Sequence, residues 1–115
     1  KARGVDFIDV SSGGLSPQQQ IAAGPGYQVP FAEAVRARTG VTTFAVGLIT
    51  EPRQAEAIVM EGKADAVALA RAMLYDPRWP WRAAAELGAT VDAPPQYWRS
   101  APHGVKGLFG PDAIA

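Results

Sequence analysis

Three short apolar segments, each followed by small residues and then by a helical pattern, organise the chain. They are residues 5–10, 42–46 and 65–69. The first two are rich in β-branched and aromatic residues, and the third is almost continuously apolar. Short runs of this kind predict β-strands, and a continuous apolar run is typical of a strand covered on both faces.

A helix is predicted over residues 27–39, between the first two strands. Pro30 has to lie in its first turn, because proline is tolerated there and not in a helix interior. Gly40 is the expected stop, since glycine readily takes the left-handed conformation that ends a helix. The stripe expected to be buried, at spacings of three and four, consists of Phe31, Ala34, Val35 and Arg38.

A second helix is predicted after the second strand. Thr50 is the expected N-cap, Pro52 lies in the first turn and Gly62 is the expected stop. Its expected buried stripe consists of Ala55, Ile58 and Val59.

A short turn over residues 71–74 follows the third strand, and Asp76-Pro77 predicts the start of another helix that ends at Gly88. The resulting order alternates strand and helix three times. This order predicts an α/β fold with parallel strands and right-handed crossovers. Two architectures satisfy it, a doubly wound open sheet and part of a (β/α)₈ barrel.

The pattern changes after this last helix. Residues 90–115 are rich in proline and glycine, so we expect an irregular, extended arm there. The arm carries Tyr97, Trp98 and Phe109, which makes it more apolar than a typical disordered segment. We therefore expect it to pack on something, with a second subunit as one candidate.

The composition excludes several classes of function and points directly to none. Eleven basic and eleven acidic residues cancel, so no charge excess points to nucleic acid. Cysteine is absent, which excludes disulfides, thiolate catalysis and zinc–cysteine sites. No apolar run approaches the ~20 residues that span a bilayer, and we expect a cytoplasmic location. The chain has no initiator methionine, and we expect a fragment or a processed chain rather than a complete translated protein.

Candidate chemistry lies in the loops that follow the strands, because parallel α/β folds bind ligands at the carboxyl ends of their strands. These loops are residues 11–14, 47–50 and 70–72. Gly47 and Ala70-Arg71 would converge on one phosphate if the last two strands are the last two of a barrel. Each loop also has a structural interpretation: a flexible connection, a tight turn at Gly47, or a surface arginine at Arg71. No metal cluster, nucleophile elbow or Walker-type loop is visible, and the lone His103 is assigned no catalysis.

Several segments together resemble Old Yellow Enzyme-type flavin oxidoreductases, in the order in which that family has them. The resemblance extends over residues 4–99, and its last part is similar to the bacterial, thermophilic-like branch. The matching segments are VDFIDVSSG (5–13), PGYQV (25–29) with FAE (31–33), AVGLI (45–49), DAVALARAML (65–74) with DP (76–77), and PPQYWR (94–99).

The resemblance implies that residues 1–89 are the last three βα units of an FMN-binding (β/α)₈ TIM barrel. It implies an ene-reductase that takes hydride from NADH or NADPH onto FMN and passes it to an activated alkene such as an enone. Gly47, Ala70 and Arg71 would bind the FMN phosphate, although the family usually has glycine where Ala70 stands. Ser12 is a weaker candidate for the phosphate or ribityl neighbourhood.

The resemblance also implies a homo-oligomer in which residues 90–115 lie at a subunit interface. Arg99 would reach the partner subunit's substrate mouth, with Tyr97 or Trp98 as lid residues. The family's carbonyl-binding pair and tyrosine proton donor lie upstream of this segment, so we expect the chain alone to be inactive without the remainder of the barrel. Two alternatives stay open: another FMN barrel, such as a dihydroorotate dehydrogenase-like or dienoyl-CoA reductase-like enzyme, and a non-catalytic oligomerising module.

Overall fold

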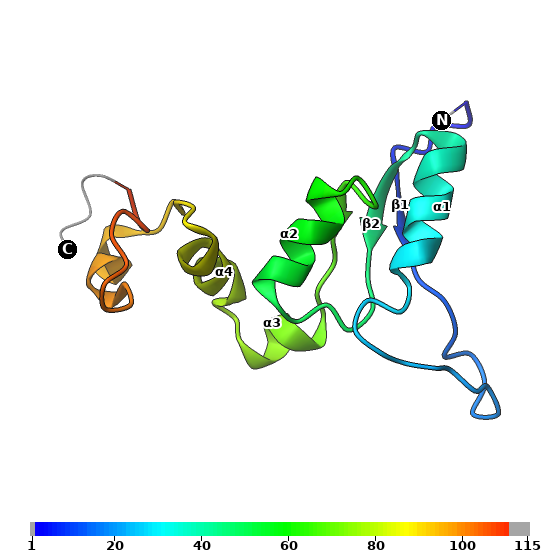
Figure 1. The fold of residues 1–115 in the computed structure, drawn as a ribbon, viewed down its shortest axis with the longest axis horizontal. Helices are drawn as coiled ribbons and strands as arrows, with labels where there is room; N and C mark the ends of the chain where they lie inside the picture. Colours follow the sequence, from blue (N-terminus) through cyan, green and yellow to red (C-terminus); the bar gives the residue numbers. More distant parts are fainter. Residues whose placement is uncertain (1, 111–115) are drawn as a thin grey trace. The chain divides into compact units, whose positions relative to one another are not determined.

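A computed structural model describes residues 2–110 of the chain (Figure 1). The chain divides into two compact units, Lys1–Ala72 and Met73–Ala115, and each is considered by itself. The elements, in chain order, are β1 (Phe7–Val10), α1 (Val29–Thr39), β2 (Thr42–Ala45), α2 (Pro52–Met60), β3 (Ala66–Val67), α3 (Arg71–Tyr75), α4 (Trp79–Leu87) and the 3₁₀ helix η1 (Pro95–Ser100).

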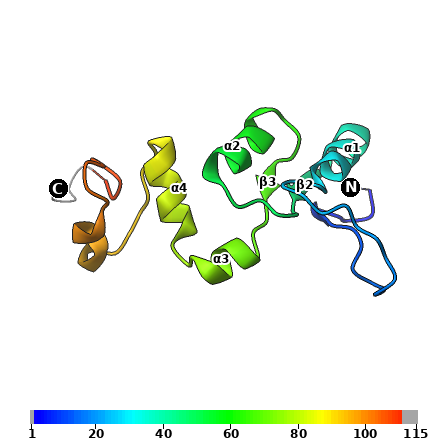
Figure 2. The same ribbon diagram turned by 60° about the horizontal axis from the view of Figure 1, so that its bottom comes forward.

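The first unit is built on a parallel sheet in the order β1-β2-β3. Phe7 pairs with Thr42 and Val10 with Ala45, and β2 pairs with β3 through Phe44 and Ala66. Helices α1 and α2 connect the strands and lie on the same side of them (Figure 2). The predicted α/β fold with three parallel strands is therefore confirmed.

The two faces of this sheet differ sharply in burial. On the face toward the helices, Thr43 and Ala45 are fully buried and Val10 nearly so. The opposite face carries Phe7 and Phe44, whose rings stack with their centroids 4.9 Å apart. Phe7 is nonetheless 56% exposed, so this unit leaves that face of the sheet uncovered.

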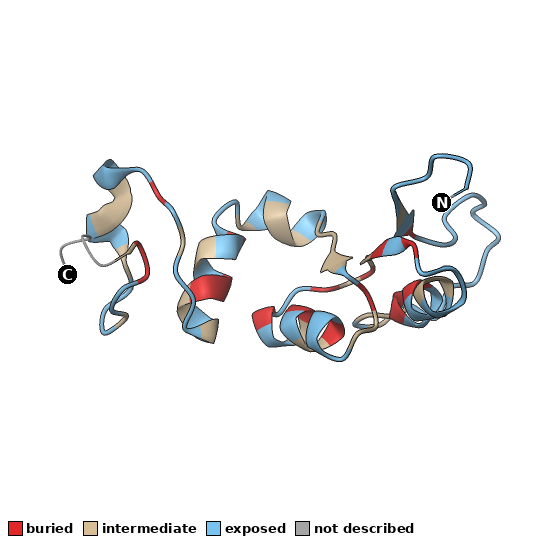
Figure 3. Cartoon of the chain, turned by 90° about the horizontal axis from the view of Figure 1, so that it is seen from above, coloured by how far each residue is buried: buried red, intermediate tan, exposed pale blue. Residues whose placement is uncertain are grey.

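The predicted buried stripe of α1 is wrong. Phe31 is 49% exposed and the buried positions are Val29 and Ala32. Figure 3 colours the chain by burial, with buried residues in red. Arg36, one turn after Ala32, donates from Nε to Asp65 Oδ1 at 3.1 Å and from a terminal nitrogen to Gly62 O at 3.0 Å. These bonds and the small Ala32 turn that side of the helix toward the strands, because residues four apart share one face of a helix.

Helix α2 begins at Pro52, with Glu51 rather than Thr50 as N-cap. Its buried residues are Pro52, Ala55 and Ile58, whereas the predicted Val59 is 39% exposed. The stops predicted for the helices hold. Gly40 and Gly88 are left-handed C-caps of α1 and α4, and Gly62 lies one residue beyond the C-cap of α2 with a φ of 71°.

Asp65 joins three elements of the first unit. Its Oδ2 accepts from the Thr43 amide at 2.9 Å on β2, and its Oδ1 accepts from Arg36 on α1. Its own amide donates to Thr43 O at 2.9 Å, which begins the pairing of β3. The Thr43 amide, with help from the Arg36 guanidinium, holds the pKa of this carboxyl below its ordinary value.

The second unit packs around α4. Its buried core consists of Ala84, Ala93, Leu108 and Phe109. Trp81 makes edge-to-face contacts with Phe109 and with Tyr97, at centroid distances of 5.2 and 5.4 Å. Aromatic packing thus holds residues 91–109 to α4, because edge-to-face contacts between aromatic rings are stabilising.

The extended arm predicted after Pro94-Pro95 is wrong for residues 95–100, which form η1. Pro94 is extended, with ψ at 142°, as a residue before proline prefers. Pro95 then starts the helical turn, because its fixed φ suits a first helical position. Trp98 Nε1 donates to Ala93 O at 2.8 Å and fastens the turn to the core.

None of the helices within residues 2–110 has the length and apolarity that crossing a membrane requires.

We predict that Asp65→Asn destabilises the chain at neutral pH and that this difference disappears in acid. The folded pKa lies below the unfolded one, so the carboxylate contributes stability above the unfolded pKa and loses it as pH falls through the folded pKa. Denaturation midpoints of both proteins between about pH 7 and pH 2 measure this. Asp92→Asn, at an exposed carboxylate, is the control. A pH-independent difference would contradict the role of the charge.

Candidate functional site

A pocket of about 170 Å³ lies at the carboxyl ends of β2 and β3, within the first unit. It is formed by the segment that leads into α1 and by the loops after the two strands. Its lining residues are Tyr27, Gln28, Val46, Gly47, Leu48, Ile49, Thr50, Ala68, Leu69, Ala70, Arg71 and Ala72. The structure thus brings together Gly47, Ala70 and Arg71, the three residues predicted to converge.

The turn after β2 has a backbone that only glycine adopts readily. Gly47 has a φ of 119°, and Leu48 follows with a φ of 51°. A Cβ at Gly47 would lie 2.8 Å from Gln28 Nε2 and 3.0 Å from the Tyr27 ring. The Gly47 carbonyl accepts from the Gly26 amide at 2.9 Å. Gly47 therefore forms a tight turn and also part of the pocket wall.

Arg71 is the only charged residue among the described residues that line the pocket. It opens α3, directly after Ala70, and its side chain is exposed. No salt bridge to Arg71 is found among residues 2–110. A guanidinium at a pocket lined otherwise by uncharged residues favours an anion at this place.

Ser12 is not among the lining residues, but it is tied to them. Its amide and its Oγ both donate to Gln28 Oε1, the hydroxyl at 2.9 Å. Gln28 Nε2 in turn donates to Val46 O at 3.3 Å. Sequence reasoning missed Gln28, because a lone glutamine before a helix carries no motif. Its burial, at 4% exposed, is visible only in the structure.

The three residues predicted for a subunit interface lie in the second unit, and their surroundings differ. The Arg78 guanidinium lies over the rings of both Tyr97 and Trp81, at 4.4 and 4.5 Å from the two centroids. Trp98 is engaged through its indole nitrogen with Ala93. Arg99 is exposed.

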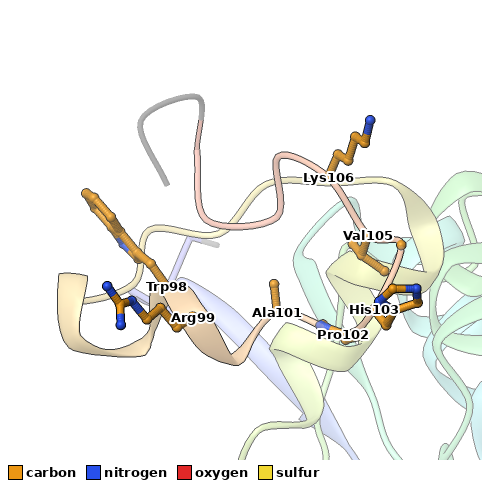
Figure 4. Close-up of a pocket in the computed structure, with 8 residues that line it drawn as sticks. Trp98, Arg99, Ala101, Pro102, His103, Val105 and Lys106 are labelled. Carbon is orange, nitrogen blue, oxygen red and sulfur yellow. The ribbon is translucent and has the colours of Figure 1, made fainter. Parts of the chain in front are cut away.

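Arg99 also borders a second cavity, of about 640 Å³, within the same unit (Figure 4). Its wall includes His103 and Lys106, and no acidic side chain of residues 73–110 lines it. Among the described residues no group of three or more histidine, aspartate or glutamate side chains could hold a metal ion.

The pocket and its parallel strands agree with what the sequence comparisons find. Residues 3–89 match the family model described as NADH:flavin oxidoreductase / NADH oxidase. The chain belongs to this family. The predicted resemblance to Old Yellow Enzyme-type flavin oxidoreductases is thereby confirmed.

Relatives of the flavin oxidoreductase family include proteins named NADPH dehydrogenase. One from Geobacillus sp. (strain WCH70) is 54% identical over 99 residues, which are 86% of this chain and 29% of the relative. One from Halalkalibacterium halodurans is 49% identical over 100 residues, with 87% and 29% covered. The chain thus spans less than a third of the length of these relatives.

We predict that Gly47→Ala destabilises the first unit by more than the ~1–3 kcal/mol expected for an unfavourable φ alone, because its Cβ also meets buried atoms. The matched control is Gly14→Ala, whose φ is 81° and whose Cβ would meet nothing within 4 Å. Chemical denaturation of the two variants separates the steric contribution from the backbone contribution. Equal losses of stability would show that the contact with Gln28 and Tyr27 does not matter.

Proposed function

We propose that this chain is the C-terminal part of an FMN-dependent ene-reductase that reduces activated alkenes with NAD(P)H, and that its pocket binds the FMN phosphate. The observation that carries the proposal is the convergence of Gly47, Ala70 and Arg71 on one pocket. The family assignment and the relatives' names supply the flavin and the nicotinamide donor.

The dimensions and charge of the pocket fit one end of such a cofactor. Its volume of about 170 Å³ is below the roughly 300–1,000 Å³ typical of pockets that enclose a whole ligand. A phosphate group is small, anionic and rich in acceptor oxygens. Arg71 offers a planar set of charged donors, and the turn around Gly47 offers backbone amides. The methyl group of Ala70 leaves its amide able to donate.

The sheet supports a barrel rather than a doubly wound architecture. Strand order β1-β2-β3 with α1 and α2 on one side is what three successive right-handed units of a barrel produce. A doubly wound sheet reverses its order and places helices on both faces. The uncovered face with Phe7 and Phe44 would line the barrel interior. The free edge of β1 would pair with the preceding strand.

In this proposal the chain holds and orients the cofactor, while the remaining strands bring the substrate-binding groups. FMN held at this pocket would supply hydride transfer from the nicotinamide to the alkene, and the proton that completes the reduction would come from a donor outside this chain. Arg71 neutralises the phosphate, and the rigid turn at Gly47 fixes the position of that end. Anchoring the far end of the cofactor orients its reactive end, which is where positioning contributes to rate.

We expect Arg71→Ala to weaken FMN binding roughly tenfold to a hundredfold, as the loss of a charge-assisted phosphate contact does. Riboflavin, which lacks the phosphate, should bind equally well to both proteins. The experiment uses the holoprotein, meaning this chain completed by the remaining strands. A suitable form is a chimera in which the chain replaces the matching segment of the Geobacillus relative.

Arg38→Ala is the matched control for Arg71→Ala, because Arg38 is exposed near the opposite end of α1 from the pocket. Its affinity for FMN should equal that of the unaltered holoprotein. FMN affinity that is the same in both variants would refute the phosphate assignment.

For the second unit we propose that Arg99 contacts the partner subunit's substrate mouth in a homo-oligomer. Arg99 is exposed, and the aromatic residues beside it hold η1 in place. In this proposal Tyr97 and Trp98 hold η1 so that Arg99 can reach the partner subunit. We propose further that Tyr97 or Trp98 is a lid residue of the partner's substrate mouth.

We expect Arg99→Ala to raise KM for the alkene about tenfold, as the loss of one charged contact does, with FMN affinity and thermal stability unchanged. Steady-state kinetics and a melting curve of the holoprotein measure both effects. Deletion of the segment is a poorer test, because Leu108 and Phe109 belong to the core. If Arg99→Ala has the same KM for the alkene as the Arg38→Ala control, Arg99 does not contact the substrate mouth.

A further inference from the structure

We infer that Gln28 is a positioning residue of the pocket, linking the loop after β1 to the turn after β2 so that the Gly47 backbone faces the phosphate. This inference rests on the proposed function of the same pocket. Gln28 itself carries no charge and acts on the ligand through the backbone that it holds.

The side chain of Gln28 is committed to the strand ends rather than to its own helix. The residue is the N-cap of α1, a position where side chains commonly accept from the first amides of the helix. Gln28 makes no such capping bond. Its Oε1 accepts both donors of Ser12, and its Nε2 donates to Val46 O, the residue before Gly47.

These contacts need an amide. Oε1 must accept while Nε2 donates, and among side chains of this length only glutamine does both. Methionine has a similar length but neither function, and an ionised glutamate cannot donate. Gln28 is 4% exposed, so its loss would remove hydrogen bonds that are shielded on the Gln28 side, although Ser12 is itself exposed and Val46 half-buried.

Gln28 also forms the wall behind Gly47. A Cβ on Gly47 would come within 2.8 Å of Gln28 Nε2, so the amide and the glycine backbone are in close packing. The Gly26 amide holds the Gly47 carbonyl from the same segment. The segment before α1 therefore fixes the turn after β2 through one backbone bond and one side chain, and only the side chain can be changed by substitution.

The test compares the affinities of the holoprotein for FMN and for riboflavin in Gln28→Met. We expect FMN affinity to fall roughly twofold to tenfold, the effect of losing one hydrogen bond from the displaced Gly47 turn to the phosphate, while riboflavin affinity stays unchanged. A general loss of structure would weaken both flavins alike, so the FMN-to-riboflavin ratio reports on the phosphate end alone. Gln20→Met, at an exposed glutamine, is the control and should leave the ratio unchanged.

Ser12→Ala provides a second variant should Gln28→Met fail to fold. It removes the 2.9 Å bond from Oγ and leaves the Gln28 side chain in place. The ratio should fall in the same direction by a smaller factor. A ratio that is unchanged in the folded variants overturns the inference, as does an equal loss of affinity for both flavins.

Arg71→Ala distinguishes a failure of the phosphate assignment from a failure of the role inferred for Gln28. If the unaltered holoprotein does not prefer FMN to riboflavin, or if Arg71→Ala keeps that preference, the phosphate assignment itself fails. If Arg71→Ala loses the preference while Gln28→Met and Ser12→Ala keep it, the phosphate assignment stands and only the role of Gln28 is overturned.

Discussion

The parallel pairing of three strands is the constraint on which the rest of this chain depends. Because β1, β2 and β3 run in the same direction, the loops that follow them emerge at one edge of the sheet. Gly47 and Arg71 are 24 positions apart in sequence and line one pocket for this reason. Asp65 reinforces the arrangement at the opposite end, where its carboxylate joins β2 to α1 as β3 begins.

Two features characterise the pocket: the charge of Arg71 and the backbone turn at Gly47. Arg71 brings the only charge among the described residues of the lining, and it does so from an exposed position that a ligand can reach. Gly47 brings no side chain, and its φ of 119° turns the chain sharply beside Gln28 and Tyr27. Gln28 belongs with the backbone contribution, since it is buried and its side chain contacts both Val46, before Gly47, and Ser12 in the loop after β1.

The first unit also shows where a larger protein would meet it. Phe7 stacks on Phe44, yet more than half of Phe7 is exposed, and Phe31 on α1 is exposed to nearly the same extent. Apolar side chains of this size are normally covered. In the proposed barrel, further strands would pack on these surfaces; the chain spans 29% of the length of its Geobacillus relative.

The sequence by itself determined the order of the elements, the glycine stops and the family. These depend on local patterns, such as apolar runs, caps and the AVGLI and ALARAML segments. A local pattern can be recognised from the order of residues alone. It also indicated Gly47, Ala70 and Arg71, because position after a parallel strand predicts a place in space. Tertiary structure alone decided the rotation of α1, the folding of residues 95–100 onto α4, and the contacts of Gln28. Each of these depends on a partner distant in sequence (Asp65 for Arg36, Trp81 for Tyr97, Ser12 for Gln28), and a one-dimensional pattern does not specify which distant groups meet.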